Sequence, residues 1–139
     1  MAPFAKFNSF VYMIATGGHN LTTDQLRVAF CSAANTPVST NSLLSNLTTN
    51  LWVGLGGSTS NVSTTGSNQA AGLYKLVVAD WVGTAQSAVA PFQYVVIYNA
   101  SRANSPLVGW YDYGGTVSMV TGDTFTIDFD QANGLLTIQ

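Results

Sequence analysis

The sequence predicts an all-β domain, built as an antiparallel β-sandwich with jelly-roll or Greek-key connections and a short N-terminal helix or arm. Three observations indicate this fold. Only 7% of the residues are charged and every acid is Asp, so Glu, a common residue of helix surfaces, is absent. The strand-favouring residues Thr, Val, Tyr and Phe are abundant. Turn-forming residues separate about eight β-prone runs, at intervals of roughly eight to twelve residues, as in sandwiches.

The central hairpin of the predicted sandwich covers residues 91–113, the densest aromatic and β-branched stretch of the chain. Side chains alternate between the two faces of a strand, so Val95 and Ile97 share one face of its first strand. Both faces are apolar in the middle, which indicates a strand covered on both sides. We therefore expect the other strands to pack against this hairpin. The face opposite Val95 carries Phe92, Tyr94, Val96 and Tyr98.

Residues 3–16 predict a short amphipathic helix, because apolar residues recur there at helical spacing and Gly17-Gly18 follows them. Pro3 is compatible with a first helical turn. The alternative is an extended arm, within residues 1–18, that reaches a neighbouring subunit. The apolar residues of this stripe are Phe4, Phe7, Phe10, Val11 and Ile14.

Two other runs alternate as strands do. In the run LRVAFC, Leu26, Val28 and Phe30 form the core face, and Arg27, Ala29 and Cys31 form a mixed face. In TFTIDF, at 124–129, the Phe and Ile side chains point inward and Thr and Asp point outward. The other elements expected are a helical turn within 42–51, strands at 52–53, 74–81, 116–120 and 135–139, a strand or connection at 82–90, and tight turns at 114–115 and 121–123.

Residues 54–68, GLGGSTSNVSTTGSN, contain almost nothing that a core could bury. They predict a flexible exposed loop, or a segment that becomes ordered on a partner. The loop does not divide the chain, because neither side carries a complete core, so residues 1–139 are expected to form one domain. It does not match a phosphate-binding loop, since no Lys-Ser/Thr follows the glycines.

Composition argues against several classes of protein. Four basic residues, widely spaced, do not form the positive patch that nucleic-acid binding requires. No apolar stretch reaches the roughly 18 residues of a membrane span. The N-terminus lacks the pattern of a signal peptide. A single cysteine, Cys31, excludes an internal disulfide, and its apolar neighbours indicate a buried side chain. We therefore expect no membrane partner and no direct nucleic-acid partner.

No catalytic, cofactor or metal signature stands out, so we expect a protein that is not an enzyme. His19 is the only histidine and lies in a turn, where it would satisfy polar groups. One His and one Cys do not make a usual zinc site. Asp128 and Asp130 lack the Glu and the spacing of a calcium loop, and turn chemistry explains them better. A sugar-binding platform would need exposed Trp side chains, and the candidates are Trp52, Trp81 and Trp110.

Several segments together resemble the small structural proteins of tailed bacteriophages. They are FNSF, GGHNL with LRVAF close behind, PFQYVVIYN, PLVGWYDYGG and GDTFTIDF, and they span most of the chain. The closest resemblance is to the jelly-roll decoration (cement) protein of a Bordetella phage. It implies a virion protein on the outer surface of the capsid, assembled in the bacterial cytoplasm, which bridges neighbouring major capsid subunits. It also implies a homodimer or higher oligomer without catalytic residues. A tail or head-fibre component and a carbohydrate-binding adsorption module are the alternatives.

The N-terminal stripe and the 54–68 loop are the parts that the predicted core needs least. We therefore expect Phe4, Phe7, Phe10 and Val11 to contact the capsid or a second copy of the chain. Deleting residues 1–16 should then leave a folded domain that no longer binds capsids. The alternative is that these Phe side chains cap the sandwich core of their own chain.

Overall fold

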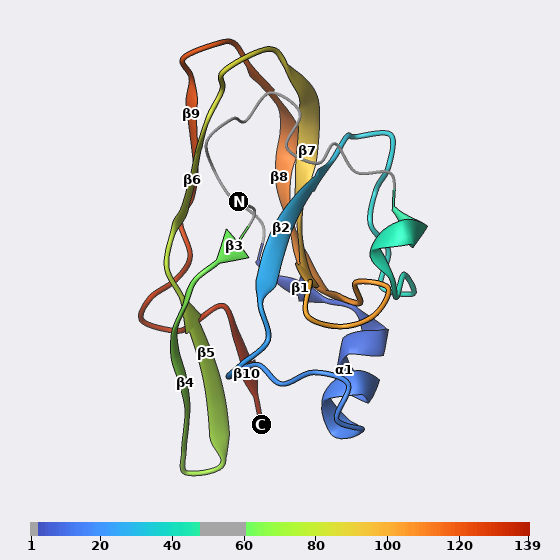
Figure 1. Ribbon diagram of the computed structural model, residues 1–139, viewed down its shortest axis with the longest axis vertical. Coiled ribbons are helices and arrows are strands. Elements are labelled where there is room, and N and C mark those ends of the chain that lie inside the picture. The colour runs from blue at the N-terminus through green and yellow to red at the C-terminus, as the bar shows by residue number, and fades with distance from the viewer. Residues whose placement is uncertain (1–2, 48–60) are drawn as a thin grey trace.

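The computed structural model describes residues 3–47 and 61–139. Within these ranges antiparallel strands dominate and α1 is the one α-helix, which confirms the predicted all-β sandwich (Figure 1). In chain order the elements are β1 (Ala5–Lys6), α1 (Asn8–Ala15), β2 (Leu26–Cys31), the 3-10 helix η1 (Leu44–Asn46), β3 (Asn61–Val62), β4 (Thr64–Ala70), β5 (Leu73–Val78), β6 (Trp81–Thr84), β7 (Val89–Asn99), β8 (Leu107–Met119), β9 (Thr124–Ile127) and β10 (Leu136–Ile138).

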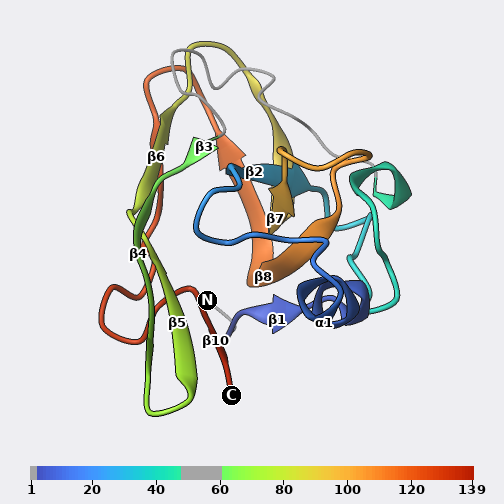
Figure 2. The same ribbon diagram turned by 60° about the horizontal axis from the view of Figure 1, so that its bottom comes forward.

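The strands form two layers. One layer is a five-stranded sheet of order β1-β8-β7-β2-β3, and the other holds a three-stranded sheet, β10-β5-β4, and the pair β6-β9. Figure 2 shows β4, β5, β6 and β9 facing β2, β7 and β8 across the interior. β2 pairs with β7 and β5 pairs with β10, so strands far apart in the sequence are neighbours, as Greek-key connections require.

The main core lies between the layers and is rich in aromatic side chains. The ring of Phe30 lies 4.6 Å from that of Phe92, and the ring of Phe92 lies 5.0 Å from that of Phe125, both in tilted or edge-on contact. Such geometry adds to the free energy of burial. Ile127 and Phe129 are also buried there, which confirms the inward face predicted for TFTIDF.

A second apolar cluster covers the opposite face of the five-stranded sheet. Val96 and Tyr98 of β7 pack there with Phe7 and Cys31, and Leu44 and Trp110 cover them from outside. Strand β7 is therefore covered on both faces, as predicted. The face predicted for Phe92 was wrong, because its side chain joins the main core together with Val95. The pairing of β7 with β8 shifts register between Phe92 and Tyr94, and this irregularity breaks the simple alternation.

The N-terminal segment is shorter as a helix than the spacing predicted. The helix begins at Asn8, because Ala5 and Lys6 pair with Trp110 and Gly109 of β8. The Phe7 amide continues this pairing with a 3.2 Å bond to the Val108 carbonyl oxygen. The extended piece therefore pairs with its own chain.

Other predictions need correction where distant pairing outweighs local signals. Residues 61–62 and 64–68 of the expected loop 54–68 lie in β3 and β4, because β3 pairs with β2 and β4 pairs with β5. The polar side chains of β4 stay largely at the surface. Residues 54–60 of that loop and the strand expected at 52–53 lie outside the described residues. Gly114-Gly115 does not end a strand, since β8 runs on to Met119. The strand expected at 74–81 is split into β5 and β6.

Candidate interaction surface

The candidate residues of the N-terminal stripe divide into buried and exposed groups. Phe7 and Phe10 are 0% and 1% exposed. The Phe7 ring lies 4.5 Å from the Trp110 ring, and the Phe10 ring lies 5.2 Å from the His19 ring. These two side chains therefore cap the core of their own chain. We correct the expectation that they form surface contacts, and we call them anchors because they hold α1 to the core. A chain without residues 1–16 would lose both, so we no longer expect it to stay folded.

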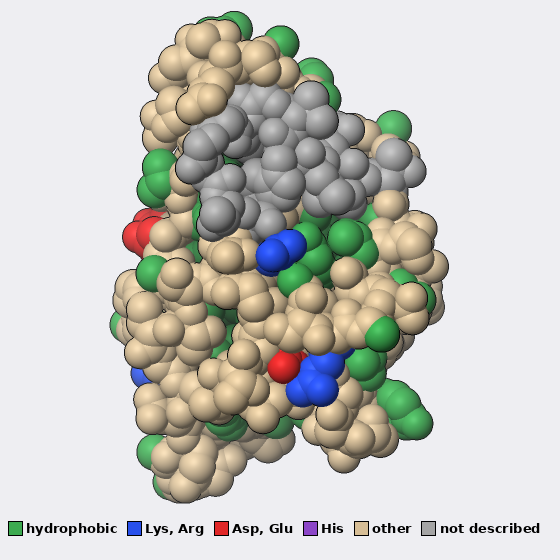
Figure 3. Space-filling view, viewed as in Figure 1, with side chains coloured by type: hydrophobic (Ala, Val, Ile, Leu, Met, Phe, Trp, Pro, Cys, Tyr) green, Lys and Arg blue, Asp and Glu red, His purple; other side chains and the backbone are tan. Residues whose placement is uncertain are grey.

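Val11 remains exposed, and its neighbour Tyr12 joins it. Their side chains are 56% and 69% exposed, which is high for large apolar residues. We call this pair the α1 face. Figure 3 shows hydrophobic side chains at the surface in the region of α1. Because Phe7 and Phe10 hold the helix to the core, the α1 face is presented on a rigid support.

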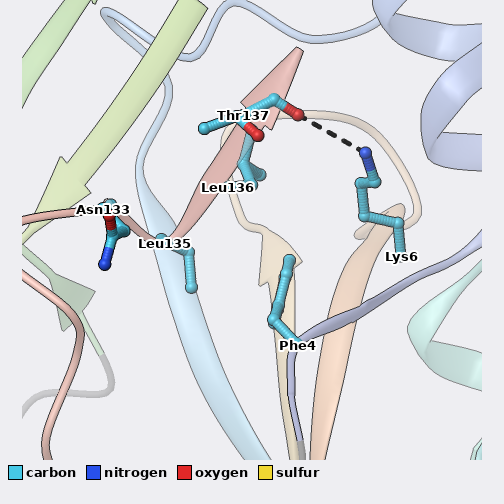
Figure 4. A pocket seen from close by; sticks show the side chains of 7 residues that line it. Phe4, Lys6, Asn133, Leu135, Leu136 and Thr137 are labelled. Carbon is cyan, nitrogen blue, oxygen red and sulfur yellow. Dashed lines mark hydrogen bonds between the residues drawn. The ribbon is translucent and has the colours of Figure 1, made fainter. Parts of the chain in front are cut away.

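Phe4, the remaining candidate, lines a groove between β1 and β10. The groove has a volume of about 340 Å³, and Figure 4 shows Phe4 and Lys6 on one wall and Asn133, Leu135, Leu136 and Thr137 on the other. The Lys6 amino group donates a 3.4 Å hydrogen bond across it to the Thr137 carbonyl oxygen. The Phe4 ring is half-buried and lies 5.1 Å from the Tyr111 ring.

A buried polar network surrounds the only histidine. The side-chain nitrogen Nδ2 of Asn99 contacts His19 Nδ1 at 2.9 Å and Asp24 Oδ2 at 2.6 Å. Since that nitrogen is a donor, His19 Nδ1 accepts, and a neutral ring then carries its proton on Nε2. Burial lowers the pKa of His19, although the charge of Asp24 partly offsets this effect. His19 therefore satisfies a buried amide, in keeping with its predicted structural role.

Burial alone would raise the pKa of Asp24, but its hydrogen bonds outweigh that effect and lower the pKa below the usual 3.8. The donors are Arg102 Nε and the Asn20 amide, each at 2.8 Å, together with Asn99. His19 and Arg102 also line a cavity of about 380 Å³ with Ile14, Tyr74 and Ile138. Among the described residues, the bonds of this network join Asn20 and Asp24 to Asn99 and Arg102, and so tie two loops together.

The other sites weighed from the sequence have structural explanations. Asp130 caps a turn, because its carboxylate accepts bonds from the amides of Ala132 and Asn133 at 2.9 and 2.8 Å. Within residues 3–47 and 61–139 no three His, Cys, Asp or Glu side chains gather as a metal site would require. Cys31 is fully buried, and burial raises its pKa to about 11.

The Trp side chains do not form an exposed platform in the described part of the chain. Trp81 is 5% exposed, and Trp110 is half-buried against Phe7. Trp52 lies outside the described residues. The residues that sequence reasoning missed are Tyr12 and the residues of the groove other than Phe4. Tyr12 could have been found as the neighbour of Val11, whereas the groove joins residues 131 positions apart, such as Lys6 and Thr137.

Comparison with known proteins found no matching family model, no matching curated protein and no matching solved structure. In the described ranges, no helix is long and apolar enough to cross a membrane.

Proposed function

We propose that this chain is a structural protein of a tailed-phage virion, which decorates the capsid and cements neighbouring major capsid subunits. The observation that carries the proposal is the N-terminal segment, where buried Phe7 and Phe10 support the exposed Val11 and Tyr12. The segments resembling phage structural proteins add to it. The partner is the major capsid protein, the site is the outer surface of the shell, and the chain acts as a homodimer or higher oligomer.

A cement protein needs a rigid body with a small adhesive surface, present in many copies. Aromatic side chains are enriched at protein interfaces, and one Tyr with one Val makes a weak contact by itself. Repetition over a shell converts weak contacts into strong retention when one oligomer holds several sites. A chain with 7% charged residues also adds little repulsion between neighbouring copies.

The test uses capsids from a phage whose gene for this protein has been deleted. Purified wild-type chain is added, and bound copies per shell are counted by gel stoichiometry and located by electron microscopy. We expect saturable binding on the shell and a higher rupture temperature. A wild-type chain that leaves shells bare, or that appears only on tails, would overturn the capsid assignment.

A second comparison tests the α1 face. The double variant Val11→Ser, Tyr12→Ser should bind far fewer copies, because it removes the exposed apolar contact. The matched control is Val82→Ser, Val120→Ser, which changes side chains that are 50% and 69% exposed elsewhere. If both variants decorate shells equally well, the contact lies on another surface.

A further inference from the structure

The groove described above is bounded by the edges of two different sheets. β1 ends the five-stranded sheet and pairs with β8, whereas β10 ends the three-stranded sheet and pairs with β5. Each strand therefore has one edge that pairs with its own sheet and one edge turned toward the other strand (Figure 4). Free strand edges are templates for pairing with another extended segment.

Backbone polar groups of both strands point into the groove. The Phe7 amide bonds to Val108 of β8, and alternate residues of an antiparallel strand direct their N–H and C=O groups to opposite edges. The backbone of Lys6 is therefore directed away from β8. The Thr137 carbonyl oxygen accepts a hydrogen bond from the Lys6 amino group, so it is reachable from the β1 side of the groove.

The side chains of the groove add an apolar floor and one positive charge. Phe4, Leu135 and Leu136 supply apolar surface, and Lys6 is the one charged residue among the described residues of the lining. Among the described residues the ion pair found joins Arg102 and Asp24, so Lys6 has no carboxylate partner there. Its amino group makes a long 3.4 Å bond to a carbonyl oxygen, which a carboxylate at closer range could replace.

We propose that this groove accepts an extended segment of the capsid partner that carries an Asp or Glu side chain. The segment adds as a strand between β1 and β10, bonds to backbone groups on their facing edges, and places its carboxylate beside Lys6. This is strand addition, in which backbone bonds supply affinity and alternate side chains supply specificity. The identity of the partner rests on the proposed function, whereas the chemistry of the groove does not.

The first test uses the full isotope-labelled chain in solution. It is titrated with an acetylated and amidated Thr-Val-Asp-Val-Thr peptide and with its Thr-Val-Lys-Val-Thr counterpart, and amide resonances are followed by NMR. We expect the Asp peptide to shift the resonances of residues 4–6 and 135–137, and to bind roughly tenfold more tightly than the Lys peptide. Shifts confined to other residues, or no shift at millimolar peptide, would overturn the proposal.

Charge reversal sharpens this test. The exposed side chain of Lys6 allows Lys6→Glu without loss of core packing, and thermal unfolding checks that the variant is folded. The variant should prefer the Lys peptide. Arg27→Glu, the same charge change on β2, should keep the preference for the Asp peptide. An unchanged preference in folded Lys6→Glu contradicts the assignment of Lys6.

The capsid assay separates this inference from the proposed function. If wild-type chain fails to bind undecorated shells while the peptide results hold, the capsid partner is wrong and the groove remains a strand acceptor. If wild-type and Lys6→Glu chains bind shells equally, the groove does not hold the capsid segment, and the proposed function still stands. We expect Lys6→Glu to reduce decoration at least about tenfold, with Arg27→Glu unchanged.

Discussion

Asp24 and Arg102 are 78 positions apart in the sequence, and Arg102 Nε donates a 2.8 Å hydrogen bond to Asp24 Oδ2. The same oxygen accepts bonds from the Asn20 amide and the Asn99 side chain. One carboxylate therefore ties the loop that follows α1 to the turn between β7 and β8. Because α1 carries the proposed contact face, this network helps to hold that face against the sandwich.

Replacing Asp24 by Asn should destabilise the chain by about 1–3 kcal/mol at pH 7, because buried donors lose a charged acceptor. The pKa of Asp24 is lowered in the folded state, so its contribution is present above pH 3.8 and is lost as pH falls through the folded pKa. Urea unfolding at pH 7 and at pH 2 should show the wild-type and variant curves converging in acid. Asp128→Asn, at an exposed position, is the charge-matched control and should behave as wild type at both pH values.

His19 should make stability fall as the solution is acidified. Burial lowers its pKa from 6.5, so below pH 6.5 the unfolded chain takes up a proton that the folded chain does not. The contribution of neutral His19 to the free energy of unfolding is then fully present above pH 6.5, and it is lost as the pH falls toward the lower pKa of the folded state. The denaturation midpoint of wild type should drop between pH 7.5 and pH 5, and that of His19→Gln should stay flatter. Equal slopes for the two proteins contradict a neutral buried ring.

Phe7→Ala should cost about 3–5 kcal/mol of unfolding free energy, since it empties a fully buried aromatic site. Val11→Ala, four residues further along the same stripe, should stay within about 0.5 kcal/mol of wild type because its side chain is exposed. Chemical denaturation of both variants measures the difference. Similar losses would mean that the stripe is not divided into anchors and a surface.

Gly109→Ala should displace β1. A methyl group there would lie 2.5 Å from the Ala5 carbonyl oxygen and would also meet the Phe4 ring. The backbone has to shift, which costs roughly 1–3 kcal/mol, and amide hydrogen exchange at Ala5 and Phe7 should accelerate. Gly115→Ala is the control, because no atom lies within 4 Å of its added methyl group. Normal protection of Ala5 in folded Gly109→Ala speaks against this packing.

Cys31 should be inert in the native chain. Burial raises its pKa to about 11, and the thiolate is the reactive form, so a disulfide reagent at pH 8 should label it only after unfolding. An added exposed thiol, in Val120→Cys, should be labelled at once and gives the reference rate. Fast native labelling of wild type would show that β2 opens or that its outer face is uncovered.

The local sequence pattern predicted those strands in which apolar and polar residues alternate clearly or in which the middle is densely apolar. In β2 the predicted core face joins the main core, while Ala29 and Cys31 join the cluster on the opposite face. The apolar middle of β7 indicated cover on both faces. The local pattern did not predict strands whose formation depends on pairing with residues distant in the sequence. The polar run 64–68 is a strand because β5 lies beside it, and Gly114 continues β8 with a φ of 74° at an irregular stretch of the β7–β8 pairing.

For the candidate surface, the sequence by itself determined that an apolar stripe stands at the N-terminus of a charge-poor β chain. Only the tertiary structure decided that Phe7 and Phe10 face inward, that Val11 and Tyr12 face outward, and that Lys6 lies across a groove from Thr137. The reason is physical. Composition and periodicity act over a few neighbouring residues, whereas burial and edge exposure depend on which remote strand the chain meets.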